Sequence, residues 1–197
     1  FDKAILNDMD WVYLNHIQEE SCEIQDDIVE MLAVDGGPRL TWNPGGCQID
    51  AGIEPQNNKA LLAHTDLLLL NKQEALAFTK TDNIQEAIRK LIAAGVSNVA
   101  ITDGSRGVAA CDGNKIYNCP VVLGVEILDT TGAGDAFGTG VTWGLLSGLS
   151  LPEALKTGTI NAASVVDAIG TQTALLTDTE ITKRLEEIDL NVSSDSL

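Results

Sequence analysis

Short apolar segments alternate with longer segments of helical periodicity in the first half of the chain. We interpret the short segments as buried strands over residues 11–15, 39–43, 67–70 and 99–102. Apolar residues at helical spacing predict helices over residues 22–34, 57–63, 72–79 and 84–94, and Gly95 is a suitable stop for the last of them. Strands that alternate with helices indicate a parallel sheet covered by helices on both faces.

The pattern changes after Thr102. Apolar segments over residues 107–111 and 115–119 flank an Asp-Gly-Asn turn and predict a β-hairpin. We further predict a strand over residues 125–128 and helices over residues 134–147, 152–169 and 178–188, followed by a flexible tail over residues 191–197. No internal repeat and no break in composition marks a second domain, so we expect one domain over residues 1–190.

Residues 129–135, with the sequence DTTGAGD, join an extended segment to the start of a predicted helix. The first-turn amides around Gly132, Ala133 and Gly134 have no intrahelical partners, and glycine allows a ligand to approach them closely. Such amides at the positive end of a helix dipole form an anion site. The carboxylate of Asp135 is unfavourable there unless it has a chemical role, such as accepting a proton from a hydroxyl beside a phosphate. The alternative is a plain strand-to-helix turn with Asp135 as an ordinary first-turn residue.

Charge and cysteine content exclude several classes of function. The net charge of −17 argues against nucleic-acid binding, which needs a basic face. The longest apolar run, residues 67–70, is far too short to span a bilayer, and no signal peptide opens the chain, so we expect a cytoplasmic protein without membrane contact. The four cysteines have no metal-ligand spacing, and we interpret them as buried free thiols: Cys22, Cys47, Cys111 and Cys119.

The sequence DTTGAGDAF resembles the second signature of the PfkB, or ribokinase-like, family of carbohydrate and nucleoside kinases. The resemblance implies a three-layer α/β/α sandwich with a mostly parallel central sheet. It also implies ATP-dependent phosphoryl transfer to a hydroxyl group of a small sugar-type acceptor. Asp135 would then take the hydroxyl proton, while the amides of Gly132, Ala133 and Gly134 bind charge on the transferring group.

Two further elements of the family are matched before this signature. Asn71 and Glu74 resemble the N-x-x-E element, and the resemblance implies that Glu74 holds Mg²⁺ through water. A capping box, with Asn71 as the helix N-cap, is the alternative, and the two roles are compatible. Residues 102–107 resemble the T-x-G-x-x-G loop along the nucleotide, which implies nucleotide contacts from Thr102, Gly104 and Gly107. Arg106 in this loop is either a phosphate ligand or a solvent-facing charge.

The resemblance also suggests roles for residues around the signature. Asp129 and Thr131 stand where many members place oxygen ligands of a monovalent cation such as K⁺, with carbonyls from a later loop. Alternatively, these two side chains only organise the turn. Asn161 lies on a helix that borders the adenine in the family, so it either contacts the base or is an exposed helical asparagine.

The match departs from the family at its N-terminal side. Full-length relatives carry more chain there, including residues that grip the sugar and a β lid, and the resemblance covers only about residues 11–177. Gly138 also stands where many relatives have asparagine. We therefore expect a kinase domain that lacks its N-terminal substrate and lid portion, with exposed surface that favours a homo-oligomer. A nucleoside or vitamin kinase of the same fold and a non-catalytic, nucleotide-binding or dimerising remnant are the alternatives.

Overall fold

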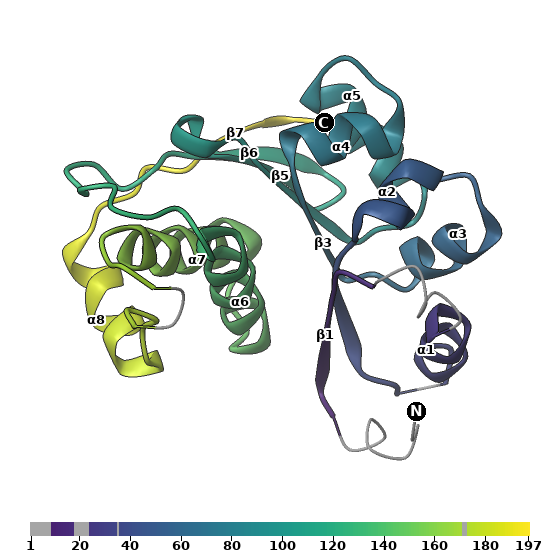
Figure 1. Cartoon of the computed structure of the whole chain (residues 1–197), viewed down its shortest axis with the longest axis horizontal. Coiled ribbons are helices and arrows are strands. Elements are labelled where there is room, and N and C mark those ends of the chain that lie inside the picture. The colour runs from purple at the N-terminus through teal and green to yellow at the C-terminus, as the bar shows by residue number, and fades with distance from the viewer. Residues whose placement is uncertain (1–8, 18–23, 35, 171–172) are drawn as a thin grey trace. The chain divides into compact units, whose positions relative to one another are not determined.

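The structure is a computed structural model that describes residues 9–17, 24–34, 36–170 and 173–197 (Figure 1). Its seven strands follow chain order, β1 to β7, in one sheet. Two compact units can be distinguished by their internal contacts. Unit 1 comprises residues 1–101, 110–114 and 197, and unit 2 comprises residues 102–109 and 115–196. The single domain predicted over residues 1–190 stays a prediction.

Unit 1 is built from parallel strands and short helices. Its strands are β1 (Trp11–Asn15), β2 (Arg39–Asn43), β3 (Leu67–Asn71) and β4 (Asn98–Thr102). Its helices are α1 (Ile24–Leu32), α2 (Gly46–Ala51), α3 (Gln56–Ala63), α4 (Lys72–Thr79) and α5 (Ile84–Ala93). The parallel pairing of β1 with β2 and of β2 with β3 confirms the strand-and-helix alternation predicted from the sequence.

The core of unit 1 lies between its strands and helices. Leu40, Trp42 and Leu68 from the strands are fully buried, as are Phe78 of α4 and Leu91 of α5. The rings of Trp42 and Phe78 meet edge to face with their centroids 6.0 Å apart. Such a pair adds about 0.5–1.5 kcal/mol to the gain from burial alone. The pair links α4, which begins at the end of β3, to the C-terminal part of β2.

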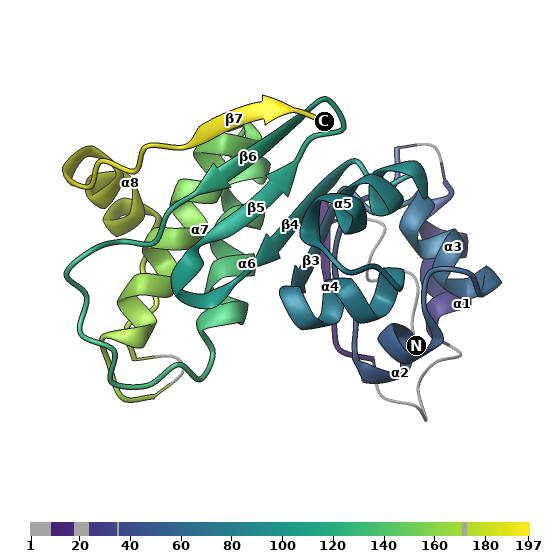
Figure 2. The same cartoon turned by 90° about the horizontal axis from the view of Figure 1, so that it is seen from above.

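Unit 2 combines antiparallel strands with three helices. The elements that it contains wholly or in part are β5 (Val108–Cys111), β6 (Lys115–Cys119), β7 (Ser193–Ser196), the 3₁₀ turn η3 (Gly104–Arg106), α6 (Ala133–Leu146), α7 (Leu151–Val166) and α8 (Asp178–Glu187). Figure 2 shows α6 and α7 side by side, and α7 packs against β6. Glycines permit this packing, because a Cβ on Gly158 would lie 2.7 Å from the carbonyl oxygen of Phe137. Thr157 adds a hydrogen bond of 2.7 Å from Oγ1 to the carbonyl oxygen of Gly140.

Two predictions differ from the structure, and one helix was missed. Residues 125–128 form no strand, because the amide of Leu128 donates to the carbonyl oxygen of Val166 at 2.8 Å instead of to a neighbouring strand. The tail predicted over residues 191–197 is ordered in part, because Ser193–Ser196 pairs antiparallel with β6 as β7. Helix α2 was not predicted. The helix predicted over residues 22–34 is α1, and its expected start at Cys22 lies outside the described residues.

Candidate active site

The turn that precedes α6 takes the form expected for an anion site. Gly132 is the N-cap and has φ 81°, a left-handed conformation that favours glycine. The first intrahelical bond runs from the amide of Ala136 to the carbonyl oxygen of Gly132 at 2.9 Å. The amide of Ala133 is used differently, in a long bond of 3.3 Å to the carbonyl oxygen of Thr130. Gly134 is the next residue of α6. Its amide has no acceptor within the helix, because the residue four positions before it lies outside the helix.

Asp135 lies on the exposed side of this first turn. A Cβ built on the neighbouring Gly134 would meet no atom within 4 Å, so open space lies directly in front of the turn. The structure thus brings together an exposed carboxylate, a glycine that allows close approach and the positive end of a 14-residue helix. This arrangement can bind a phosphate beside a proton acceptor.

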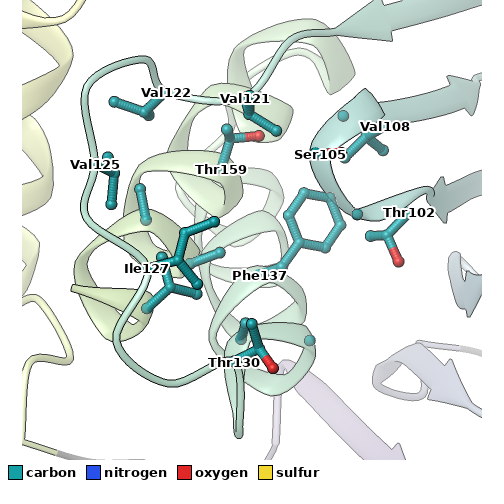
Figure 3. A pocket seen from close by; sticks show the side chains of 17 residues that line it. Thr102, Ser105, Val108, Val121, Val122, Val125, Ile127, Thr130, Phe137 and Thr159 are labelled. Atoms are coloured by element: carbon teal, nitrogen blue, oxygen red, sulfur yellow. The ribbon is translucent and has the colours of Figure 1, made fainter. Parts of the chain in front are cut away.

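A pocket of about 330 Å³ opens beside the turn, entirely within unit 2 (Figure 3). Its wall includes Ala133 and Gly134 of α6 and Thr102, Gly104 and Gly107 of the preceding loop. Phe137 reaches into it between the loop and the segment that follows β6. The remaining lining residues are Ser105, Val108, Val121, Val122, Val125, Ile127, Thr130, Thr159, Ala162, Ala163 and Val166.

The pocket is lined mainly by apolar side chains. Four hydroxyl groups are the exceptions among the lining residues, and that of Thr159 lies 3.4 Å from the thiol of Cys119. Apolar walls suit a flat ring system, whereas the amides at the mouth suit charged oxygens. The sequence analysis missed this wall, because it interpreted part of the VVLGVEIL segment as a strand. The exposed fraction of Ile127, 67%, is the feature that sets this segment apart from a sheet strand.

The loop at residues 102–107 is held by its own contacts. Arg106 donates from Nε and Nη2 to the two carboxylate oxygens of Asp103, at 2.7 and 2.6 Å. This hydrogen-bonded pairing raises the pKa of Arg106 above its usual value. Gly107 has φ 84°, and a Cβ there would lie 2.2 Å from the carbonyl oxygen of Cys119. Gly107 is therefore required by the fold, and Arg106 points into solvent with its charge paired.

Asp129 shapes the turn, as the structural alternative predicted. Its Oδ1 accepts a hydrogen bond of 2.9 Å from the amide of Thr131. Hydrogen bonds from Thr131 are the main cause that lowers the pKa of Asp129 below its usual value. The side chain thus stays ionised where it would face a cation, and the cation role of Asp129 and Thr131 stays a prediction.

Asn161 is buried, not exposed, so that part of the sequence prediction is wrong. Its side chain is 3% exposed and lies between α6 and the segment before α8. Nδ2 donates to the carbonyl oxygen of Ala136 at 2.8 Å, and Oδ1 accepts from the amide of Leu176 at 3.1 Å. Both polar atoms have partners inside the protein, and Asn161 does not line the pocket. Contact with a base stays a prediction that these bonds do not favour.

Asn71 and Glu74 form the predicted capping box in unit 1. The amide of Glu74 donates to Oδ1 of Asn71 at 2.9 Å, and the amide of Asn71 donates to Oε2 of Glu74 at 2.8 Å. These bonds explain why α4 begins at the end of β3. They occupy one oxygen of the Glu74 carboxylate, and a carboxylate has further acceptor capacity. The metal role of Glu74 therefore stays a prediction that the cap permits.

Three of the four cysteines lie within the described residues. Cys111 and Cys119 are buried and Cys47 is half-buried, and all three are thiols outside any disulfide. Burial raises the pKa of Cys111 and of Cys119 above the usual value for a thiol. Cys22 lies outside the described residues. None of the helices in the described part of the chain has the length and apolar character to cross a membrane.

Comparison with known families identifies the class of protein. Residues 47–178 match the model of the "pfkB family carbohydrate kinase". The chain therefore belongs to the pfkB family of carbohydrate kinases, which confirms the resemblance drawn from the DTTGAGD sequence.

Similarity to individual relatives is moderate. A 1-phosphofructokinase of Haloferax volcanii is 35% identical over 155 residues, covering 76% of this chain and 48% of the relative. A nucleoside kinase of Methanocaldococcus jannaschii is 30% identical over 137 residues, covering 68% and 44%. A sugar kinase of Archaeoglobus fulgidus is 28% identical over 136 residues, covering 69% and 53%. The chain thus spans about half the length of these curated relatives.

Solved structures confirm the fold class. The ribokinase of Arabidopsis thaliana, crystallised with ribose and ATP, superposes with a TM-score of 0.78 at 25% identity and covers 94% of this chain and 58% of that one. The ribokinase of Thermotoga maritima gives a TM-score of 0.74 at 23% identity, covering 94% and 60%. The predicted ribokinase-like α/β fold with a mostly parallel sheet is correct.

Proposed function

We propose that this chain carries the ATP-binding and catalytic part of a kinase that phosphorylates a hydroxyl group of a small sugar-type acceptor. The observation that carries the proposal is the exposed Asp135 on the first turn of α6, beside the open space in front of Gly134. A helix N-terminus by itself stabilises a carboxylate, but this carboxylate stands beside the space that a phosphate would occupy, where proton transfer gives it a chemical role.

The pocket in unit 2 would hold the nucleoside part of ATP. Its volume of about 330 Å³ and its apolar lining are typical of sites for small molecules. Gly104 and Gly134 line it, and a Cβ on either glycine would meet no atom within 4 Å. The phosphates would lie against these two backbones, with the γ-phosphoryl group toward Asp135.

The reaction follows from this arrangement. Asp135 accepts the proton of the acceptor hydroxyl as the acceptor oxygen forms its bond to the γ-phosphorus. The bond between the γ-phosphorus and the oxygen that bridges to the β-phosphate breaks, and ADP leaves with that electron pair. Amides of the turn around Gly132, Ala133 and Gly134 stabilise charge on the phosphoryl oxygens. In a loose transition state little proton transfer is needed early, so a carboxylate suffices as the base.

Ions complete the proposed site. The described residues contain no cluster of three or more metal-ligating side chains, which suits Mg²⁺ because it keeps several waters and rests mainly on the phosphates. Glu74 would hold these waters with the part of its carboxylate that the α4 cap leaves available. Mg²⁺, when bound, supplies positive charge that neutralises the phosphates. Asp129 and Thr131 would provide oxygens for K⁺.

The experiment combines turnover with nucleotide binding. We expect the chain to transfer the γ-phosphoryl group of Mg-ATP to some member of a panel of sugars, nucleosides and vitamins, and to melt at a higher temperature with Mg-ATP. Asp135→Asn should lower kcat by about 10²–10⁴-fold and leave the Mg-ATP melting shift unchanged, because the base acts on the acceptor. Near-normal turnover in this variant would contradict the role of Asp135.

The same measurements separate the alternatives. Activity confined to nucleosides or vitamins would show that the acceptor is a nucleoside or a vitamin and not a sugar. A Mg-ATP melting shift without turnover on any acceptor indicates a nucleotide-binding protein that does not catalyse transfer. No shift and no turnover would reject the proposal altogether.

A further inference from the structure

Helix α7 holds both ends of the turn that carries Asp135. Before the turn, the carbonyl oxygen of Val166 accepts hydrogen bonds from the amides of Leu128 and Asp129, at 2.8 and 3.4 Å. After the turn, Nδ2 of Asn161 donates to the carbonyl oxygen of Ala136 at 2.8 Å. The two attachment points on α7 lie five residues apart in the sequence. The placement of the turn therefore depends on α7.

The bond from Asn161 is the side-chain part of this attachment, and its direction follows from the partners of both amide atoms. The side chain is 3% exposed, and Oδ1 is fixed by the amide of Leu176 at 3.1 Å. If Nδ2 and Oδ1 exchanged places, Nδ2 would face the amide of Leu176, and Oδ1 would face the carbonyl oxygen of Ala136. Neither pair can form a hydrogen bond. Leaving a buried partner without its bond is unfavourable, so Nδ2 is kept on Ala136.

Ala136 directly follows Asp135, so a shift of its carbonyl group moves the carboxylate. We propose that Asn161 is a positioning residue that sets the place of Asp135 and does not contact the nucleotide base. This inference rests on the proposed kinase function of the site. A misplacement of about 1 Å at a reacting group lowers the rate roughly 10²-fold. Loss of the buried hydrogen bond between Asn161 and Ala136 should therefore have a large effect on turnover.

Asn161→Asp tests the proposal with almost no change of shape. The new side chain keeps an oxygen for the amide of Leu176, but it loses the donor to Ala136 and sets a carboxylate against that carbonyl group. We expect kcat to fall about 10–100-fold, with KM for ATP within about threefold of wild type. A base contact predicts the opposite pattern, with a raised KM and a changed preference between ATP and GTP. That result would overturn the proposal.

Ser164→Ala is the matched control on the same helix. Ser164 Oγ donates to the carbonyl oxygens of Ala174 and Asn161, at 2.7 and 2.8 Å, so its loss loosens the segment before α8 but leaves the side-chain bond from Asn161 to Ala136 in place. We expect kcat within about twofold of wild type for this variant, since the turn keeps both its attachments. An equal loss of kcat in both variants would show that general loosening is responsible, and it would overturn the positioning role.

Amide hydrogen exchange gives a readout that needs no turnover. Asn161→Asp should accelerate exchange in residues 129–137, and Ser164→Ala should not. If Asn161→Asp fails to fold, wild-type exchange decides: the amide of Leu176, which donates to Oδ1 of Asn161, should be protected as strongly as those of α7, and exchange more than about tenfold faster rejects the placement of the Asn161 side chain. If wild type neither binds nor turns over Mg-ATP, the proposed function fails, while these exchange results still decide the attachment.

Discussion

Gly140 and Gly158 face each other where α6 crosses α7. A Cβ on Gly140 would lie 2.8 Å from the Cα of Gly158 and 2.9 Å from the carbonyl oxygen of Thr157. Both of these are backbone atoms, which cannot rotate away as a side chain does. The two helices can thus approach each other only because neither carries a side chain at this point.

Gly140→Ala should therefore destabilise the fold. The added methyl group forces the backbones of α6 and α7 apart, and overpacking of this kind costs about 1–3 kcal/mol. The better helix propensity of alanine offsets only part of it, about 1 kcal/mol or less. Thermal and urea unfolding measure the effect. Stability at or above the wild-type value would show that the helices do not cross in this way.

Gly134→Ala should have the opposite effect on stability, and it would weaken the site. A Cβ on Gly134 meets no atom within 4 Å, and alanine in a helix gains about 0.5–1 kcal/mol over glycine. The same methyl group would occupy the space through which a phosphate approaches the turn. We expect an unchanged or higher melting temperature and a Kd for Mg-ATP raised about tenfold or more, which corresponds to at least 1.4 kcal/mol.

Gly140→Ala serves as the comparison for this result. Its methyl group acts on the helix crossing, so it should lower stability without changing the affinity of whatever folded protein remains. Unaltered Mg-ATP binding in Gly134→Ala, measured by calorimetry, would place the phosphates elsewhere.

Glu74→Gln separates the capping role of Glu74 from its proposed metal role. Glutamine also completes a capping box, so the bond to the amide of Asn71 is retained and the loss of the charge at the start of α4 costs at most about 1 kcal/mol. A neutral amide orients metal-bound water poorly. We expect the Mg²⁺ concentration for half-maximal turnover to rise several-fold, with little change in melting temperature.

A second capping box provides the matched control. Glu153 accepts a hydrogen bond of 3.0 Å from the amide of Ser150 at the start of α7. Glu153→Gln should change stability as little as Glu74→Gln does and leave the Mg²⁺ dependence unaltered. The metal role is wrong if both variants keep the wild-type Mg²⁺ dependence.

Local signals explain why much of the fold could be predicted from the sequence. Helix α4 was placed correctly because Asn71 and Glu74 mark its start and a buried apolar strand precedes it. The start of α6 was predictable for the same reason, since Gly132 of the DTTGAGD segment takes the left-handed conformation at which the helix begins. These features depend on residues a few positions apart, which a sequence pattern records directly.

Features that depend on distant partners were not predictable. Residues 193–196 have the sequence SSDS, which has low strand propensity, and they form β7 only because β6 offers a free edge. Leu128 looks like the end of a strand, yet its amide bonds to Val166, 38 positions later. The pocket wall and the burial of Asn161 have the same origin, because both depend on how α7 packs.

Asp129→Asn separates the turn-forming role of Asp129 from its proposed cation role. The asparagine oxygen still accepts the hydrogen bond from the amide of Thr131, so the turn should persist. The negative charge is lost, and a monovalent cation is then held only by neutral oxygens. If the wild-type protein melts at a higher temperature in KCl than in tetramethylammonium chloride of equal concentration, this difference should vanish in Asp129→Asn.

Asp112→Asn is the control, because Asp112 Oδ1 accepts the amide of Asn114 at 2.9 Å in a turn of the same kind outside the site. It should retain the full difference between the two salts. A K⁺ response that survives in Asp129→Asn, or one that Asp112→Asn also loses, is incompatible with a cation bound at Asp129. In either case Asp129 would act on the turn alone.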